Sequence, residues 1–273
     1  MEYQIRTVAK GLQLGEGCIW DEKRNQIHYL DIEGYKIFSY SLESGQTQEL
    51  DVGDYVGCIV LDTNDDLIAA VHNRLIRVHP ETKKCDIMME IEQPDWIRFN
   101  DGKLDQYGNL WVGTMAIDQS HAEAAGAGKL YCIKGKNILA CYDGFTIPNG
   151  LAWNEKGDIF YHIDTPTRKI DAYDVVREGI LQNRRTVVEI EAGEGDPDGM
   201  CIDTCGNLWV AMWGGCKVSC YSPETGCKLN EIALPDKNVS CCVIGGKEHN
   251  TLFVTTARDE NEDGGKMYVV GVE

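Results

Sequence analysis

The chain has 273 residues and carries 26 Lys and Arg against 44 Asp and Glu, a formal net charge of −18. This charge repels nucleic-acid phosphates and anionic membrane surfaces, so we expect no nucleic acid and no membrane as a partner. No uncharged apolar run approaches the ~20 residues that cross a bilayer, and the first residues lack the basic and apolar regions of a signal peptide. We therefore expect a cytoplasmic protein.

The twelve cysteines would suit a disulfide framework only in a short secreted chain, and no Cys-x-x-Cys pair occurs. We expect most of the thiols to be reduced. Cys18, Cys58, Cys132, Cys201 and Cys242 fall within apolar strand patterns, where free cysteine packs as a small hydrophobic residue.

A strand-like run over residues 3–8 precedes six copies of one sequence unit. The copies begin at intervals of 41 to 49 residues, at Glu16, Gly57, Asn100, Asn149, Asp198 and Ser240. Each copy has three short runs rich in β-branched and aromatic residues, separated by Gly, Asn and Asp turns. A fourth run follows in the first five copies, over residues 47–50, 85–88, 138–142, 185–190 and 229–232.

The repeat length is that of a four-stranded propeller blade, ~40–50 residues. The pattern predicts an all-β fold, a six-bladed β-propeller with four antiparallel strands per blade, as one domain over residues 1–273. The sixth copy lacks a fourth run, because the chain ends at Glu273 after its third. We expect residues 3–8 to supply that outer strand and to close the ring.

The residues at the repeat starts should converge on the propeller axis, because every blade begins its innermost strand on the same face. Four of them, Glu16, Asn100, Asn149 and Asp198, offer oxygen ligands that suit Ca²⁺, Mg²⁺ or Mn²⁺. No histidine occupies a start, which argues against a structural zinc site, although zinc could still bind. The alternative is that Asn and Asp before Gly are ordinary turn formers.

Six short phrases that carry this pattern resemble a known family. They are residues 14–17 (LGEG), 98–103 (RFNDGK), 113–115 (GTM), 148–151 (PNGL), 197–203 (PDGMCID) and 256–258 (TAR). Together they resemble the senescence-marker-protein, gluconolactonase and luciferin-regenerating family, which includes regucalcin. The resemblance runs from about Leu14 to the C-terminus and keeps its order throughout.

The resemblance implies a metal-dependent hydrolase of carboxylic ester bonds that acts on sugar lactones such as gluconolactone. It implies one divalent cation, Ca²⁺, Mg²⁺, Mn²⁺ or Zn²⁺, bound by Glu16, Asn149 and Asp198. The residue matching Asp198 would also activate the attacking water, and those matching Arg98 and Asn100 would bind the sugar. This agrees with general chemistry, because a cation that polarises a carbonyl also lowers the pKa of water for a neighbouring carboxylate base.

One departure from the family lies after residues 113–115, where an acidic pair is often found and this chain has Ile117 and Asp118. We expect Asp118 to keep the sugar contact with a shorter reach. Residues 119–128, rich in Ala and Gly, are a candidate lid.

Two other functions stay open. One is a calcium-binding regulatory propeller without catalysis, since a conserved scaffold does not ensure chemistry. The other is a lactonase or esterase for apolar substrates, for which Phe, Leu and Met should line the channel mouth.

Overall fold

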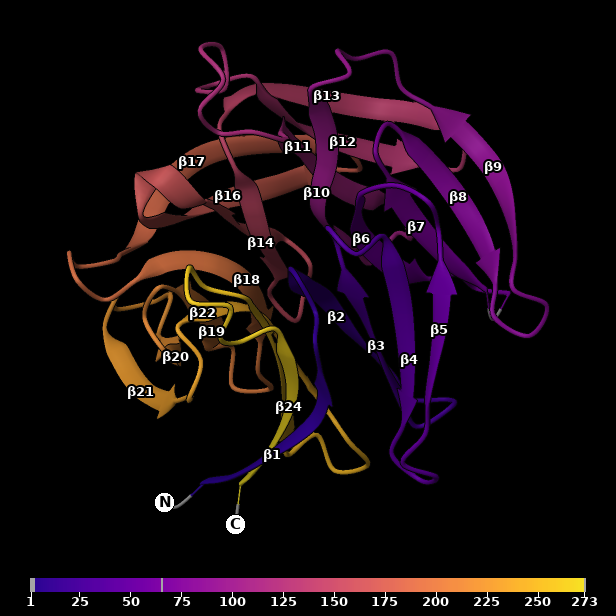
Figure 1. Ribbon diagram of the computed structural model, residues 1–273. Helices are drawn as coiled ribbons and strands as arrows, with labels where there is room; N and C mark the ends of the chain where they lie inside the picture. Colours follow the sequence, from indigo (N-terminus) through magenta and orange to yellow (C-terminus); the bar gives the residue numbers. More distant parts are fainter. Residues whose placement is uncertain (1–2, 65, 273) are drawn as a thin grey trace.

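Six four-stranded antiparallel sheets lie in a ring in the computed structural model, which describes residues 3–64 and 66–272 (Figure 1). We call these sheets blades 1 to 6. The first strands of neighbouring blades contact one another in a closed cycle, from β2 through β6, β10, β14, β18 and β22 back to β2. These six strands therefore surround the axis, and the prediction of a six-bladed β-propeller is confirmed.

The strands of blades 1 to 3, from innermost to outermost, are β2 (Gly15–Asp21), β3 (Gln26–Asp31), β4 (Lys36–Ser41) and β5 (Thr47–Asp51); β6 (Val56–Leu61), β7 (Leu67–Val71), β8 (Arg74–His79) and β9 (Lys84–Glu90); β10 (Ile97–Leu104), β11 (Leu110–Ala116), β12 (Gly128–Lys134) and β13 (Asn137–Phe145). Those of blades 4 to 6 are β14 (Pro148–Trp153), β15 (Ile159–Asp164), β16 (Lys169–Arg177) and β17 (Ile180–Glu189); β18 (Asp196–Ile202), β19 (Leu208–Trp213), β20 (Lys217–Tyr221) and β21 (Lys228–Ala233); β22 (Asn238–Gly245), β23 (Thr251–Ala257), β24 (Lys266–Val272) and β1 (Tyr3–Lys10).

The N-terminal strand closes the ring. β1 pairs with β24 in antiparallel register from Tyr3 opposite Val272 to Lys10 opposite Lys266, so blade 6 is built from both ends of the chain. β1 and β24 lie side by side in Figure 1. The predicted pairing of residues 3–8 with the third strand of the sixth copy is confirmed.

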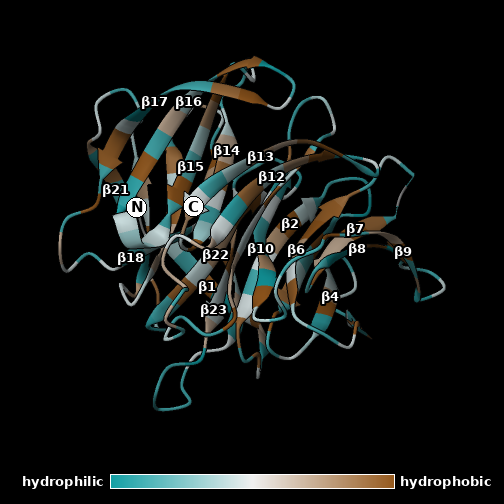
Figure 2. Ribbon diagram, turned by 90° about the horizontal axis from the view of Figure 1, so that it is seen from above, coloured by the Kyte–Doolittle hydropathy of each residue, from teal (hydrophilic) through white to brown (hydrophobic). Residues whose placement is uncertain are grey.

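The core consists of apolar layers between adjacent blades. Trp111 of blade 3 lies 5.3 Å from Phe160 and 6.4 Å from Trp153 of blade 4, measured between ring centroids. Figure 2 shows the hydrophobic segments on the strands, while the connecting loops are largely hydrophilic. In the part of the chain that the structure describes, no helix is long and apolar enough to span a membrane.

Each innermost strand carries an irregularity in its pairing at the repeat start. The register of β2 shifts between Glu16 and Ile19, that of β14 between Asn149 and Leu151, and β6, β10, β18 and β22 show equivalent shifts. Such bulges turn a side chain away from the regular alternation of a strand. This is why residues at the repeat starts reach the axis.

Glycine permits these irregularities. Gly17 has φ +55°, a left-handed conformation that other residues adopt only under strain. At Gly150 a Cβ atom would lie 2.7 Å from the carbonyl oxygen of Asp198, because the inner strands of blades 4 and 5 approach closely there. The Gly after a repeat start is therefore required by backbone packing.

We expect deletion of residues 1–8 to lower the melting temperature by roughly 10 °C or more, because it leaves β24 as an unpaired edge and opens the ring. Thermal denaturation followed by circular dichroism measures this. The control is Ile5→Thr, which changes an exposed side chain of β1 but keeps the strand. Equal melting temperatures for the deletion and the control would show that β1 is not needed for closure.

Candidate functional site

A cavity of about 270 Å³ lies at the axis, where the inner strands carry their bulges. Its polar lining consists of Glu16, Arg98, Asn100, Asn149, Asp196 and Asp198, together with Thr165. Six of these come from the innermost strands of blades 1, 3, 4 and 5, and Thr165 comes from the turn after β15. Four of the six repeat starts, Glu16, Asn100, Asn149 and Asp198, therefore lie at one cavity, whereas Gly57 and Ser240 do not line it.

Two carboxylates are buried in this cavity. The Glu16 side chain accepts a hydrogen bond from the backbone N–H of Gly17 at 2.7 Å. Burial raises its pKa to about 8, and the charge of Asp101 adds to the shift. The pKa of Asp198 is also raised well above its ordinary value, first by burial and then by the charge of Glu16. The charge of Glu16 thus opposes the ionisation of Asp198.

A chain of hydrogen bonds crosses three blades and fixes the two amides. Asn100 Nδ2 donates to Asn149 Oδ1 at 2.7 Å and to the carbonyl oxygen of Pro148 at 2.9 Å. Asn149 Nδ2 in turn donates to Thr165 Oγ1 at 2.8 Å. The Thr165 hydroxyl donates to the carbonyl oxygen of Pro197 at 2.8 Å, directly before Asp198. The orientation of each amide is therefore determined by its neighbours.

Arg98 supplies a buried positive charge. Its Nη1 donates to Asn100 Oδ1 and to the carbonyl oxygen of Phe99, both at 2.8 Å. Burial lowers the pKa of Arg98 to about 10, while the charge of Glu16 opposes this shift. The guanidinium therefore stays protonated near neutral pH and partly balances the two carboxylates.

Thr165 is a residue of the cavity lining that sequence reasoning missed. It opens a short 3-10 helix, η1 (Thr165–Thr167), that directly follows Asp164 at the end of β15. The position carries no repeat signal, because the turns after the second strand differ between blades. Asp196 was missed as well; it forms an ion pair with Arg168 at the edge of the cavity.

The donor set fits a hard divalent cation. Among the described residues, no group of three or more His, Cys, Asp and Glu side chains is arranged to hold a metal. The candidate site instead combines only two carboxylates, Glu16 and Asp198, with the amide oxygen of Asn149. Oxygen ligands of this kind suit Ca²⁺, Mg²⁺ or Mn²⁺. A cation bound there would also offset the burial that raises the pKa of both carboxylates.

The remaining walls of the cavity are apolar and consist of Leu14, Ile32, Met115, Ile147 and Trp213. Two aspartates at strand ends hold the segments that carry Leu14 and Ile147. Asp31 accepts hydrogen bonds from the backbone N–H groups of residues 13 and 14, and Asp164 accepts them from those of residues 146 and 147. Both aspartates therefore act as loop anchors.

The structure does not bring Asp118 to the cavity. This residue is exposed, its carboxylate accepts a hydrogen bond from the backbone N–H of Ser120 at 2.8 Å, and it is not part of the cavity lining. The candidate lid over residues 119–128 does not line the cavity either. It is anchored at the side of blade 3, where Ala124 is buried and the ring of His121 stacks on Trp96.

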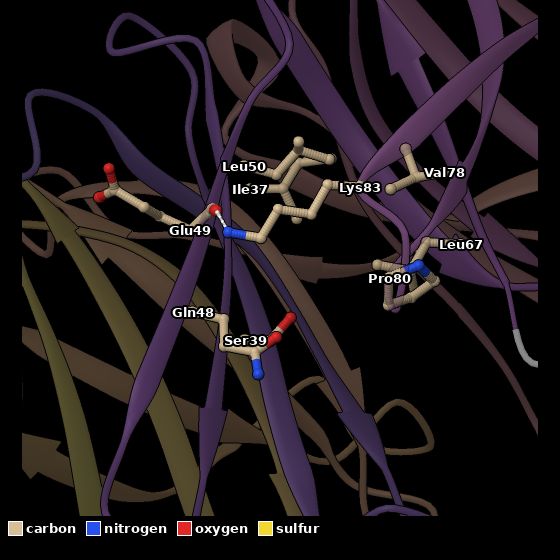
Figure 3. A pocket seen from close by; sticks show the side chains of 9 residues that line it. All are labelled: Ile37, Ser39, Gln48, Glu49, Leu50, Leu67, Val78, Pro80 and Lys83. Carbon is tan, nitrogen blue, oxygen red and sulfur yellow. Dashed lines mark hydrogen bonds between the residues drawn. The ribbon is translucent and has the colours of Figure 1, made fainter.

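A second pocket, between blades 1 and 2, is a packing seam. Ile37, Leu50, Leu67 and Val78 line it, and Lys83 Nζ closes it by donating to the carbonyl oxygen of Glu49 at 3.1 Å (Figure 3). Its volume is about 20 Å³, which is too small for a sugar-sized ligand. The axial cavity is therefore a better candidate for binding a substrate than this pocket.

Comparison with known proteins identifies the family. Residues 14–258 match the family described as SMP-30/Gluconolactonase/LRE-like region. Regucalcin of Gallus gallus is 36% identical over 252 residues, which cover 90% of this chain and 84% of that protein. The chain belongs to the SMP-30/gluconolactonase/LRE-like family. Membership of this family supports a lactonase function.

Two further comparisons agree with this assignment. A Bacillus subtilis protein, YvrE, named provisionally as a sugar lactone lactonase, is 32% identical over 253 residues, which cover 90% of this chain and 84% of that protein. The solved structure of a luciferin-regenerating enzyme superposes with a TM-score of 0.92 at 25% identity and covers 99% of this chain and 96% of its own. The predicted family is confirmed.

We expect the metal-free protein to lose stability as the pH rises from about 5 to 8. Glu16 has an ordinary pKa of 4.5 and a folded-state pKa of about 8, so its proton stabilises the fold below about pH 4.5 and this contribution is lost as the pH approaches 8. Melting temperatures measured in a chelator across this range test the effect.

The matched variant is Glu16→Gln, which cannot titrate, so its melting temperature should depend less on pH. Added divalent cation should raise the melting temperature of the wild type more at pH 8 than at pH 5, because cation and proton compete for the same carboxylates. Identical pH profiles for the wild type and Glu16→Gln would contradict this assignment.

Proposed function

We propose that the protein is a divalent-metal-dependent lactonase that hydrolyses sugar lactones, with the cation held by Glu16, Asn149 and Asp198. The observation that supports this most is the meeting of two buried carboxylates, a fixed amide and a buried guanidinium in one cavity of a lactonase-family propeller. A divalent cation bound there would supply the Lewis acidity that polarises a lactone carbonyl and acidifies water.

In this proposal Asp198 is the general base that takes the proton of the attacking water. It is suited to this role because no donor in the described part of the chain forms a hydrogen bond with its carboxylate, whereas Glu16 already accepts one from Gly17.

Arg98 and Asn100 orient the substrate. Their hydrogen bond to each other, and the bond from Asn100 to Asn149, hold both side chains before a ligand arrives. Such preorganisation lowers the entropic cost of reaching a reactive geometry. Asp118, which the sequence suggested as a further sugar contact, has no role in this proposal because it lies away from the cavity lining.

A calcium-binding regulator fits the cavity less well. A site that only binds calcium gains affinity from each added negative charge, and a buried Arg98 would oppose the cation. A substrate-orienting role gives this arginine a function that the regulator does not.

A lactonase for apolar substrates is favoured by one observation, the five apolar side chains that line the walls. A hydroxyl group that faces such a wall loses its hydrogen bonds to water, at a cost of about 1–3 kcal/mol. The hydroxyl groups of a sugar lactone must therefore point toward Arg98 and Asn100.

We expect Asp198→Asn and Asp198→Ala to lower kcat by ~10²–10⁴ at every cation concentration, because added cation can refill a weakened site but cannot replace a base. Asn149→Ala removes only a neutral ligand, so its activity should return in part as the cation concentration rises. Steady-state lactone hydrolysis during cation titration after chelation separates the two cases. Near-normal turnover by Asp198→Ala, or no hydrolysis of any lactone by the wild type, would overturn the proposal.

We expect Arg98→Ala to lower kcat/KM for a polyhydroxylated lactone by roughly 10- to 100-fold, the loss of a charged hydrogen bond worth about 1.5–3 kcal/mol. For an unsubstituted alkyl lactone of similar ring size the change should be much smaller. The control is Asp118→Ala, which should affect neither substrate because Asp118 lies outside the cavity lining. If kcat/KM falls equally for both lactones, Arg98 has an electrostatic role and does not orient hydroxyl groups. If the wild type prefers the alkyl lactone, the protein is better described as a lactonase for apolar substrates.

A further inference from the structure

Two pairs of buried cysteines connect β22, the innermost strand of blade 6, with its two neighbouring blades. Cys18 Sγ lies 3.3 Å from Cys241 Sγ, and Cys201 Sγ lies 3.9 Å from Cys242 Sγ. All four are free thiols and at least 94% buried. Each pair joins different blades, since Cys18 belongs to blade 1, Cys201 to blade 5, and Cys241 and Cys242 to blade 6.

The two pairs point in opposite directions from β22. Successive side chains of a strand alternate between its faces, so Cys241 packs toward blade 1 and Cys242 toward blade 5. The apolar clusters agree with this, because Cys241 packs with Cys18 and Phe253, while Cys242 packs with Cys201. The Cys18–Cys241 pair therefore spans the junction at which the last blade meets the first.

The Cys18–Cys241 pair also borders open space. A cavity of about 10 Å³, enough for one water-sized molecule, is lined by both residues together with Asp101, Lys103 and Cys242. Cys201 does not line this cavity. The first pair therefore borders a space of about the size of one water molecule, whereas burial excludes a bulky disulfide reagent.

We propose that Cys18 and Cys241 are a peroxide-dependent modification site that forms a disulfide between the first and the last blade. One thiol sulfur attacks an oxygen of hydrogen peroxide, the O–O bond breaks, and water leaves as the thiol becomes a sulfenic acid. The second thiol then attacks the sulfenic sulfur and releases a second water. Two thiols are oxidised to one disulfide, and one peroxide is reduced to two waters.

The geometry requires little movement for this reaction. A disulfide holds its sulfur atoms ~2.05 Å apart, so the pair must close a gap of roughly 1.3 Å from its present 3.3 Å. The bond would connect residues 223 positions apart and constrain the unfolded chain. The ring, which the hydrogen-bonded pair of β1 and β24 already closes, would then also be closed by a covalent bond. This inference does not depend on the proposed lactonase activity.

The experiment uses the full-length protein with its five exposed cysteines, Cys85, Cys141, Cys205, Cys216 and Cys227, replaced by Ser, so that only buried thiols can react. After treatment with hydrogen peroxide, a non-reducing tryptic map should show the peptide of Cys18 joined to the peptide that holds Cys241 and Cys242. The melting temperature should rise by roughly 5–15 °C, and a reductant should reverse both changes.

Variants of the adjacent residues Cys241 and Cys242 identify which sulfur is bonded to Cys18. In the same background Cys242→Ala should keep the link, and Cys241→Ala should lose it together with the rise in melting temperature. Cys18→Ala replaces Cys241→Ala if the latter does not show the circular dichroism of the folded protein. The proposal is overturned if no link to the Cys18 peptide forms, if the only link joins Cys201 and Cys242, or if the link persists in Cys241→Ala.

Discussion

Closure of the ring by the N-terminal strand is the constraint on which the rest of the structure depends. β1 and β24 pair across the whole length of the chain, and this pairing fixes blade 6 beside blade 1. Only in a closed ring do six inner strands share one axis. Glu16 of blade 1 and Asp198 of blade 5 are far apart in the sequence. They line the same cavity because the closed ring brings their blades around one axis.

The axis concentrates charge that would be costly in an isolated strand. Burying a carboxylate is unfavourable unless hydrogen bonds, an opposite charge or a cation compensate it. Arg98 and the backbone of Gly17 compensate in part, while the raised pKa values of Glu16 and Asp198 show that compensation is incomplete. The divalent cation that we propose would offset this residual imbalance.

The repeats predicted most of the fold because each blade has its own local signals. Intervals of 41 to 49 residues, the fourth strand-like runs and the leftover run over residues 3–8 were enough to infer six blades and their closure. The bulges were not predicted, because they depend on how closely neighbouring inner strands approach. The Ala and Gly content of residues 119–128 predicts a candidate lid, but it does not reveal that Ala124 packs against Ile97 and Ala116 of blade 3.

The sequence by itself determined the all-β class, the number of blades, the family and the positions that face the axis. These depend on local strand propensity and on periodicity, which can be read along one chain. The tertiary structure alone decided which polar groups contact one another: Thr165 between Asn149 and Pro197, Asp118 away from the cavity, and Cys18 beside Cys241. Such contacts join different blades or depend on the path of a loop, so they exist only once the ring has closed and the side chains have packed.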